Sequence, residues 1–270
     1  MDTVSADIKK SRIKATAVIK EAALILKNNW QKLLGLYLFF LVPVLVISML
    51  QQSFASGSKI VQTVVGAAAF VVTLCIGNWG VISLVIAIDK ISAGFSATIK
   101  ENISEARRHF FSYLAAMIIF AAFALVIVSV VVLAMPLHVN ALTGGMNRLV
   151  LLLIDAVAVA VVFVALYFVI RCSLYGVCCV IENMGPIQAL KRSHELVKKH
   201  INNVVGTFAL FGIITIAAGA ILSAAAFVIK NDKVLTVVGI LYQAIMGLVL
   251  TPFWVAVMVV LYQKLREVAE

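Results

Sequence analysis

Charged residues are scarce in this chain of 270 residues. Only 13% of the residues are charged and 63% are hydrophobic, whereas roughly a quarter of the residues in an ordinary soluble domain are charged. Several apolar runs exceed the ~18–20 residues that a helix needs to cross the hydrocarbon of a bilayer. A soluble core has no room for this much apolar surface, so we predict an all-α, polytopic membrane protein. The runs are continuous rather than alternating, which argues against a membrane β-barrel.

Motifs that carry catalysis or bind metal ions are also missing. No Ser-His-Asp constellation, pair of carboxylates or glycine-rich phosphate loop can be assembled from the sequence. Cys75, Cys172, Cys178 and Cys179 lie within or at the ends of apolar runs and lack the spacing of a metal motif. Thiols in such runs usually pack as small hydrophobes, although acylation of Cys178 or Cys179 near a membrane face stays open. We therefore expect no enzyme activity, no metal and no cofactor.

Acidic residues are outnumbered by basic ones, with 12 Asp and Glu against 22 Lys and Arg. Most of the basic residues lie in three segments, at 6–32, 89–108 and 182–203. We interpret each segment as a basic amphipathic helix that lies on an anionic membrane surface. Attraction to lipid headgroups explains the excess of positive charge, so no nucleic-acid partner is expected.

The three basic segments also resemble one another in sequence. Shifts of 80 and 91 residues superpose them, and each precedes an apolar hairpin. This order predicts an internal repeat, with copies at about 6–88, 89–181 and 182–270 of a single membrane domain, 1–270. A chance match within an apolar chain is the alternative. The matched positions are Lys20, Lys100 and Lys191; Lys27, Arg107 and Lys198; Asn29, His109 and His200; Trp30, Phe110 and Ile201; and Gly35, Ala115 and Gly206.

Each predicted copy contributes two transmembrane helices. The six spans are expected at about 33–50, 60–88, 110–136, 148–181, 204–229 and 234–261. Of the 22 Lys and Arg, 17 lie with the termini and the basic segments, and four lie in the loops on the other side. Short loops rich in Lys and Arg stay in the cytoplasm, so both termini are predicted to be cytoplasmic. Glycines within the spans are typical of close helix contacts; these are Gly77, Gly80, Gly212 and Gly219.

Two ionisable residues, Asp155 and Arg171, lie well inside apolar runs and are candidate functional residues for that reason. They are 16 residues apart, which is ~24 Å along a straight helix, so they are not expected to pair. Arg171 is interpreted as an interfacial arginine that reaches headgroups or an acid, or as a ligand of a phospholipid phosphate. Glu182 is 11 residues further on, on the same face of a continuous helix but distant from Arg171. The candidate lipid- or anion-binding residues are Arg171, Lys191, Arg192, Lys198, Lys199, Arg107 and Arg108.

Residues from Arg171 to Phe208 resemble one group of bacterial proteins. The residues that carry the resemblance are Arg171, Glu182, Gly185, Ala189, Arg192, Ser193 and Leu196, with Pro252 and the ending Leu261–Arg266 further on. They are similar to the glycerophosphoryl-diester-phosphodiesterase membrane-domain family and to YciC-type inner-membrane proteins. Gln263 and Lys264 stand where the family's ending has an acid. The resemblance implies a six-helix domain in the bacterial inner membrane and no activity, because the catalytic domain of the fused members is not found in this sequence.

The expected function is that of a non-enzymatic integral membrane protein. Such a protein organises the membrane, interacts with anionic lipid headgroups, or serves as a scaffold for a protein partner or a second copy of itself. Three basic amphipathic segments around an apolar bundle motivate this interpretation. The alternative is a transporter or lipid-handling permease with a path near Asp155 and Arg171.

Overall fold

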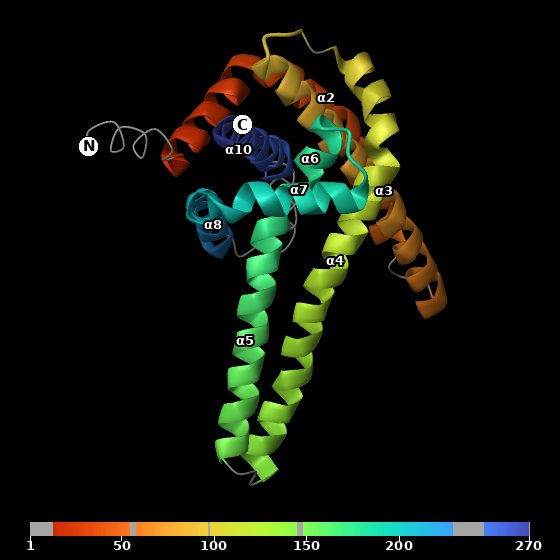
Figure 1. Cartoon of the computed structure of the whole chain (residues 1–270). Coiled ribbons are helices and arrows are strands. Elements are labelled where there is room, and N and C mark those ends of the chain that lie inside the picture. The colour runs from red at the N-terminus through yellow and green to blue at the C-terminus, as the bar shows by residue number, and fades with distance from the viewer. Residues whose placement is uncertain (1–12, 55–57, 97, 145–147, 229–245, 270) are drawn as a thin grey trace, which may run out of the picture.

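The computed structural model describes residues 13–54, 58–96, 98–144, 148–228 and 246–269, with side chains over most of them. These residues are helical and include no strand, which confirms the all-α prediction for the described part of the chain. The helices are α2 (Ala15–Ser53), α3 (Lys59–Ser92), α4 (Ile99–Gly144), α5 (Arg148–Cys172), α6 (Tyr175–Ile181), α7 (Pro186–Lys198), α8 (Ile201–Val228) and α10 (Thr251–Ala269), with a π-helical turn, η1 (Met246–Leu250), before α10 (Figure 1).

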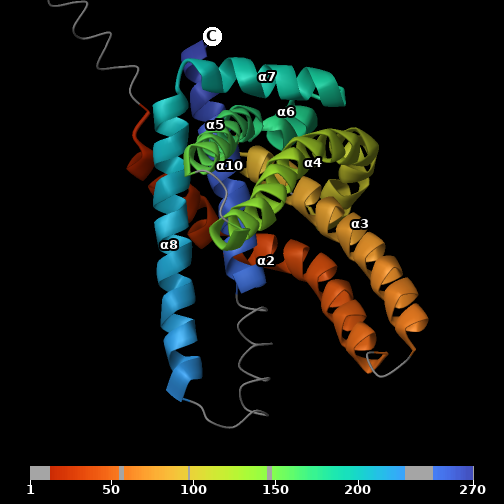
Figure 2. The same ribbon diagram turned by 90° about the horizontal axis from the view of Figure 1, so that it is seen from below.

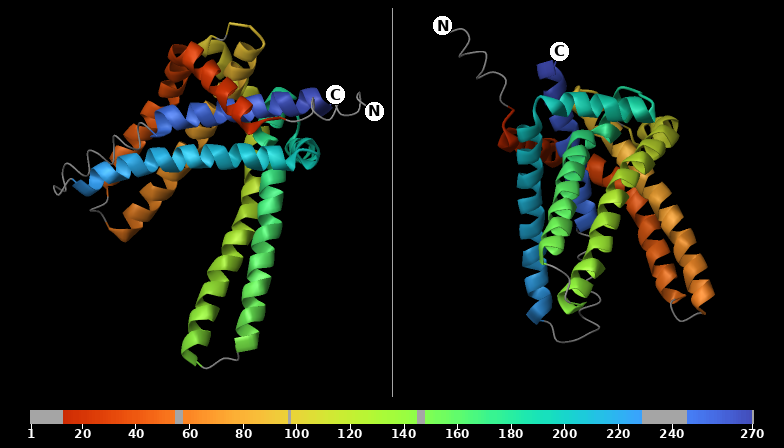
Figure 3. Two further views of the ribbon diagram at one scale, coloured as in Figure 1. Left: turned by 90° about the vertical axis from the view of Figure 1, so that its left-hand side faces the viewer. Right: turned by 60° about the horizontal axis from the view of Figure 1, so that its bottom comes forward.

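The helices form three splayed arms that meet at one end of the molecule, which we call the hub. Two arms are the hairpins α2 with α3 and α4 with α5, and the third contains α8, as the right-hand view of Figure 3 shows. The view from below separates the same three arms (Figure 2). Helix α7 crosses the hub, where α2 begins and α10 ends (Figures 1 and 3). The hub consists of α6, α7 and the adjoining parts of the longer helices, at 13–40, 80–91, 102–116 and 252–265.

The hub holds the buried core, and the arms leave it. Leu33, Ile82, Leu174 and Leu261 are fully buried there. Further along the arms, large apolar side chains face outward, such as Phe70 with 67% of its surface exposed and Ile216 with 72%. Exposed apolar area of this extent costs free energy in water, at ~25 cal/mol per Å². The arms therefore require an apolar environment.

Within the described part of the chain, five helical stretches are long and apolar enough to cross a membrane. They are Ala15–Gln51, Lys59–Ser92, Ala156–Ile181, Ile201–Ala220 and Gly247–Ala269. Only 6% of the most apolar window within Ala156–Ile181 is buried inside the protein, so this stretch gains most from contact with lipid. Of the six predicted spans, the third lies in α4, where many of the side chains fall outside the described part of the chain. The first twelve residues of the sixth, 234–245, fall outside it too.

The fourth predicted span is not one helix, which corrects the sequence prediction. A continuous helix is predicted over 148–181, whereas α5 ends at Cys172 and α6 begins at Tyr175. Hydropathy misses this break because both sides of it are equally apolar. As a consequence, Arg171 and Glu182 do not share the face of one helix.

The links between basic segments and spans also differ along the chain. Helix α2 runs through both, with a kink at Asn29 (φ −124°, ψ 21°) whose side-chain amide donates to the Ile25 carbonyl at 3.2 Å. Helix α4 likewise contains both, whereas α7 ends at Lys198 and α8 begins at Ile201. Helix α3 ends at Ser92, and Gly94, two residues further on, lies in the left-handed region at φ 81°. A kink within α2 and two residues between α7 and α8 thus connect elements that hydropathy alone cannot separate.

Among the glycines whose surroundings the structure describes, the two tightest contacts with a neighbouring helix lie at the hub. An added Cβ at Gly80 meets Phe40 at 3.0 Å, as the prediction of close contact requires, but one at Gly77 or Gly212 meets nothing within 4 Å. The tightest approach, at Gly176 in α6, was not among the predicted positions: a Cβ there lies 2.7 Å from Cε2 of Tyr113. The backbone of α6 therefore rests directly on this ring.

Replacing Gly176 by alanine is expected to destabilise the protein by about 1–3 kcal/mol, because the buried Tyr113 ring cannot move aside without disturbing its neighbours. The matched control is Gly212→Ala, in open space within α8, which is expected to be neutral or stabilising by up to ~1 kcal/mol because alanine favours helix. Unfolding of the detergent-solubilised variants measures both. Equal effects of the two substitutions would contradict the close packing of α6 on Tyr113.

Candidate functional site

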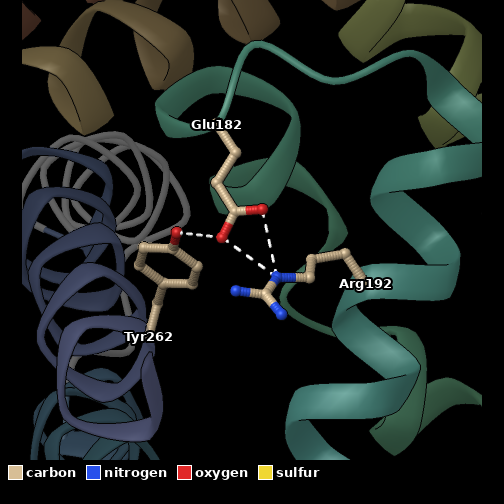
Figure 4. Close-up of polar contacts among 3 residues, drawn as sticks. All are labelled: Glu182, Arg192 and Tyr262. Carbon is tan, nitrogen blue, oxygen red and sulfur yellow. Dashed lines mark hydrogen bonds and ion pairs between the residues drawn. The ribbon is translucent and has the colours of Figure 1, made fainter. Parts of the chain in front are cut away.

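A polar cluster in the hub joins three helices through one carboxylate (Figure 4). Glu182 follows the last residue of α6, Arg192 lies on α7 and Tyr262 lies on α10. The Tyr262 hydroxyl donates to Oε1 of Glu182 at 2.5 Å, and Nε of Arg192 lies 3.1 Å from both carboxylate oxygens. We call these three residues the Glu182 clamp. It fastens α10 to the middle of the chain across 80 residues of sequence.

The local backbone presents Glu182 to its partners. Asn183, the next residue, has φ 50°, and asparagine is among the residues that tolerate this left-handed conformation best. The turn redirects the chain into Gly185 and Pro186, where α7 begins. Proline at the first turn of a helix needs no backbone donor, so the sequence at 183–186 specifies a sharp reversal that brings α7 back over α6.

The clamp is partly shielded from water. The side chain of Glu182 is 12% exposed and that of Arg192 is 28% exposed, while Tyr262 is buried. Burial by itself lowers the pKa of Arg192, but the hydrogen bond and the charge of Glu182 outweigh it and raise that pKa above its usual value. Arg192 is therefore a permanent cation that belongs first to Glu182. Only its outer nitrogens remain for a headgroup.

The break between α5 and α6 is bridged by a single hydroxyl. Ser193 on α7 is fully buried; its Oγ donates to the Arg171 carbonyl at 2.9 Å and accepts from the Leu174 amide at 3.0 Å. Helix ends leave backbone groups without partners, and these two would otherwise be buried in an apolar hub. Ser193 therefore makes the interruption of the apolar stretch possible.

Arg171, one of the two candidate residues within apolar runs, lies at this break. Its Nη1 is 3.0 Å from Nε2 of His194, and its guanidinium stands 4.2 Å from the centre of the Tyr167 ring. A guanidinium can only donate, so the His194 nitrogen accepts and the ring is neutral, with its proton on Nδ1. Nε of Arg171 is buried and has no partner among the described residues. Arg171 is thus held between α5 and α7 and does not pair with an acid in the described part of the chain.

Further polar pairs tie the remaining helices together at the hub. Gln263 donates to Asp89 at 2.9 Å, Lys264 lies 2.6 Å from Glu21, and Lys90 lies 2.6 Å from Glu105. These contacts link α10 to α3, α10 to α2, and α3 to α4 respectively. Exposed pairs of this kind contribute only ~0–1 kcal/mol each, so they orient the helices more than they stabilise them.

The structure gathers some of the predicted site residues and disperses others. Arg171 and Lys191 both lie next to His194, and Arg192 lies in the Glu182 clamp. Four candidate cations are exposed on the surface of the hub away from these contacts; they are Arg107, Arg108, Lys198 and Lys199. The side chain of Asp155 lies outside the described part of the chain. Within the described residues, no group of three His, Cys, Asp or Glu side chains is placed to hold a metal ion.

Sequence reasoning missed the role of Glu182 and Tyr262. Both occur among the residues that carry the family resemblance, yet no local signal connects positions 80 residues apart. The only available hint was the presence of an acid and a hydroxyl at the edges of apolar runs. Their connection depends on the path of α7 and α10.

Fold and site together define a class: an all-α protein whose long apolar helices can cross a membrane and are fastened at one end by polar contacts. Residues 14–265 match the family described as Domain of unknown function (DUF7847), and the chain belongs to that family. Comparison with curated proteins and with solved structures found no match. The resemblance to the phosphodiesterase membrane domain and to YciC-type proteins gains no support from these comparisons and stays a prediction.

Proposed function

We propose that this protein is an integral protein of the bacterial inner membrane that binds and organises lipids from the cytoplasmic face without catalysis. The observation that carries the proposal is the separation of two surfaces. Large apolar side chains are exposed along the arms, and exposed cations lie on the hub; these are Arg107, Arg108, Lys191, Lys198 and Lys199. Hydrocarbon suits the first surface, and anionic headgroups suit the second.

The burial pattern supports three copies of one unit, with six spans. Positions matched by the shifts of 80 and 91 residues are buried in every copy; they are Ala22, Asn102 and Ser193; Leu33, Tyr113 and Val204; and Leu36, Ala116 and Thr207. The same shifts match three phenylalanines, each of which packs on an aromatic ring of a later helix. The pairs are Phe40 with Trp79, Phe120 with Tyr175 and Phe211 with Trp254. A chance match does not predict equal burial at equal positions.

Both ends of the chain are expected on the cytoplasmic side, because the excess of Lys and Arg lies with the hub. Reporter fusions measure this: a cytoplasmic reporter after residue 270 is expected to be active, and the same reporter inserted at residue 56 is expected to be inactive. An insertion at residue 146 serves as the second far-side position. An active cytoplasmic reporter at residue 56 or 146, or an inactive one after residue 270, would refute the proposed orientation.

Removing the exposed hub cations is expected to reduce the anionic lipid that accompanies the purified protein. The variant replaces Arg107, Arg108, Lys198 and Lys199 with glutamine. Each basic residue near the surface contributes ~1 kcal/mol to attraction of anionic lipid, so the ratio of phosphatidylglycerol to phosphatidylcholine retained from a mixed bilayer falls severalfold. Mass spectrometry of the extracted lipids measures the ratio. Lys59→Gln, at the far end of α3, is the control. If the four-cation variant retained the same lipid ratio as Lys59→Gln, the proposal would be contradicted.

A lipid-handling permease is the second candidate, and one observation favours it. A cavity of about 640 Å³ lies where the arms meet the hub, and its lining includes Phe120, Tyr175, Phe211 and Trp254. Its walls are mainly apolar, which suits a lipid chain rather than an ion. Scrambling of fluorescent phospholipid in proteoliposomes tests this candidate. Equal scrambling rates for the wild type and Arg171→Leu would contradict a lipid path near Arg171.

A further inference from the structure

A groove of about 370 Å³ opens between α4, α5 and α7, separate from the Glu182 clamp. Its apolar walls include Ile119 and Phe123 on α4, and Phe168 on α5. Its polar residues all come from α7, which crosses the hub ends of α4 and α5 (Figure 1). The groove is therefore polar toward the hub and apolar along the arm.

The polar end carries one cation, Lys191, that forms no ion pair within the described residues. Lys191 is exposed. His194 lies one turn further along α7 and lines the groove with a ring that is neutral because Arg171 donates to its Nε2. Nδ1 of that ring is therefore a hydrogen-bond donor. Glu195 also lines the groove and is the one group there that opposes an anion.

The apolar end is open to the surroundings of the arm. Phe123 is 55% exposed and Phe168 is 44% exposed, and their rings stack at 6.4 Å. Ile187 on α7, which also lines the groove, is 60% exposed. In an arm immersed in hydrocarbon these side chains meet lipid, and the groove gives that lipid a fixed place.

We propose that this groove binds one anionic phospholipid, with its phosphate at Lys191 and His194 and one acyl chain along Ile119, Phe123 and Phe168. The inference rests on the proposed function and specifies one site within it. The volume lies near the lower end of the ~300–1,000 Å³ of small-molecule sites, so it holds one chain and the phosphate region while the second chain stays in the bilayer. The cation binds the phosphate by charge, and the order of polar and apolar walls matches that of a lipid.

A protein segment fits the groove less well. A helix that docks by its apolar face places anchors at i, i+3, i+4 and i+7 along a hydrophobic groove, whereas this groove changes from apolar to polar between α5 and α7. A second copy of the chain would also have to present an anion to Lys191. A single anionic phospholipid supplies both an apolar chain for the walls and an anion for Lys191.

The test uses the full chain, purified in detergent, with phosphatidylglycerol as the probe and native mass spectrometry as the readout. One retained lipid per chain is expected. Ile119→Trp fills the groove and is expected to abolish that species, whereas Ile118→Trp, on the neighbouring side chain that is 58% exposed, leaves it unchanged. Lys191→Gln is expected to weaken retention about fivefold, from the ~1 kcal/mol of one basic residue, and Lys198→Gln much less. Glu195→Gln is expected to increase retention.

Three results would overturn the inference: no discrete one-lipid species, equal effects of the two tryptophan variants, or equal effects of Lys191→Gln and Lys198→Gln. Any of them leaves the proposed function intact if the four-cation variant still loses anionic lipid from mixed bilayers. Conversely, the one-lipid species could be lost in Ile119→Trp but not in Ile118→Trp, while the four-cation variant retains its anionic lipid. That result would support the lipid site in the groove and refute the proposed binding of anionic lipid by the hub cations.

Discussion

Replacing Glu182 with alanine is expected to lower the free energy of unfolding by about 2–3 kcal/mol. Removing one partner from a buried ion pair typically costs ~3–5 kcal/mol because the other charge is left unpaired. Arg192 keeps 28% exposure, so water relieves part of that cost. The Tyr262 hydroxyl, which is buried with its ring, also loses its acceptor. Unfolding of the purified protein in mixed micelles measures the loss.

The matched control is Glu21→Ala, which removes the acid of an exposed pair. Glu21 is 47% exposed and lies 2.6 Å from Lys264, and pairs of this kind contribute ~0–1 kcal/mol. A double-mutant cycle of Glu182→Gln with Tyr262→Phe separates the two contacts, and the combined loss is expected to be smaller than the sum because the residues share a bond. A loss for Glu182→Ala no greater than that for Glu21→Ala would show that the clamp does not fasten α10.

Replacing Ser193 with alanine is expected to cost about 2–4 kcal/mol, because two buried backbone groups lose their partner together. A buried donor or acceptor left unsatisfied costs ~1–3 kcal/mol. The groups are the Arg171 carbonyl and the Leu174 amide. Since Arg171 and His194 lie beside the same break, the substitution is also expected to change the position of Arg171. Unfolding in mixed micelles measures the loss of stability.

Ser83→Ala is the control for this substitution. Ser83 is as fully buried as Ser193, but its hydroxyl donates only to the Trp79 carbonyl within its own helix. That carbonyl also accepts from the helix backbone, so its loss is expected to cost well under ~1 kcal/mol. Similar losses for both serines would mean that the α5–α6 break does not depend on the α7 hydroxyl.

The candidate site could be predicted only in part from the sequence. Arg171 was found because an ionisable residue in an apolar run is visible locally. The sequence also places Arg192 among cations of an amphipathic segment, but its binding to Glu182 is not visible there. Gln263, which stands where an acid was expected from the family resemblance, donates to Asp89 across 174 residues of sequence. The acid that Gln263 contacts lies on α3, and only the folded chain reveals this contact.

The sequence by itself determined the class of fold, the apolar stretches and the basic segments beside them, because run length, composition and charge are properties of neighbouring residues. Breaks at glycine and proline, as at Gly94 and Pro186, are equally local. The tertiary structure decided where α5 ends, which acid holds Arg192, and which residues border the groove under α7. These depend on contacts between segments far apart in the chain, and a residue's hydropathy indicates whether it avoids water but not which partner it meets.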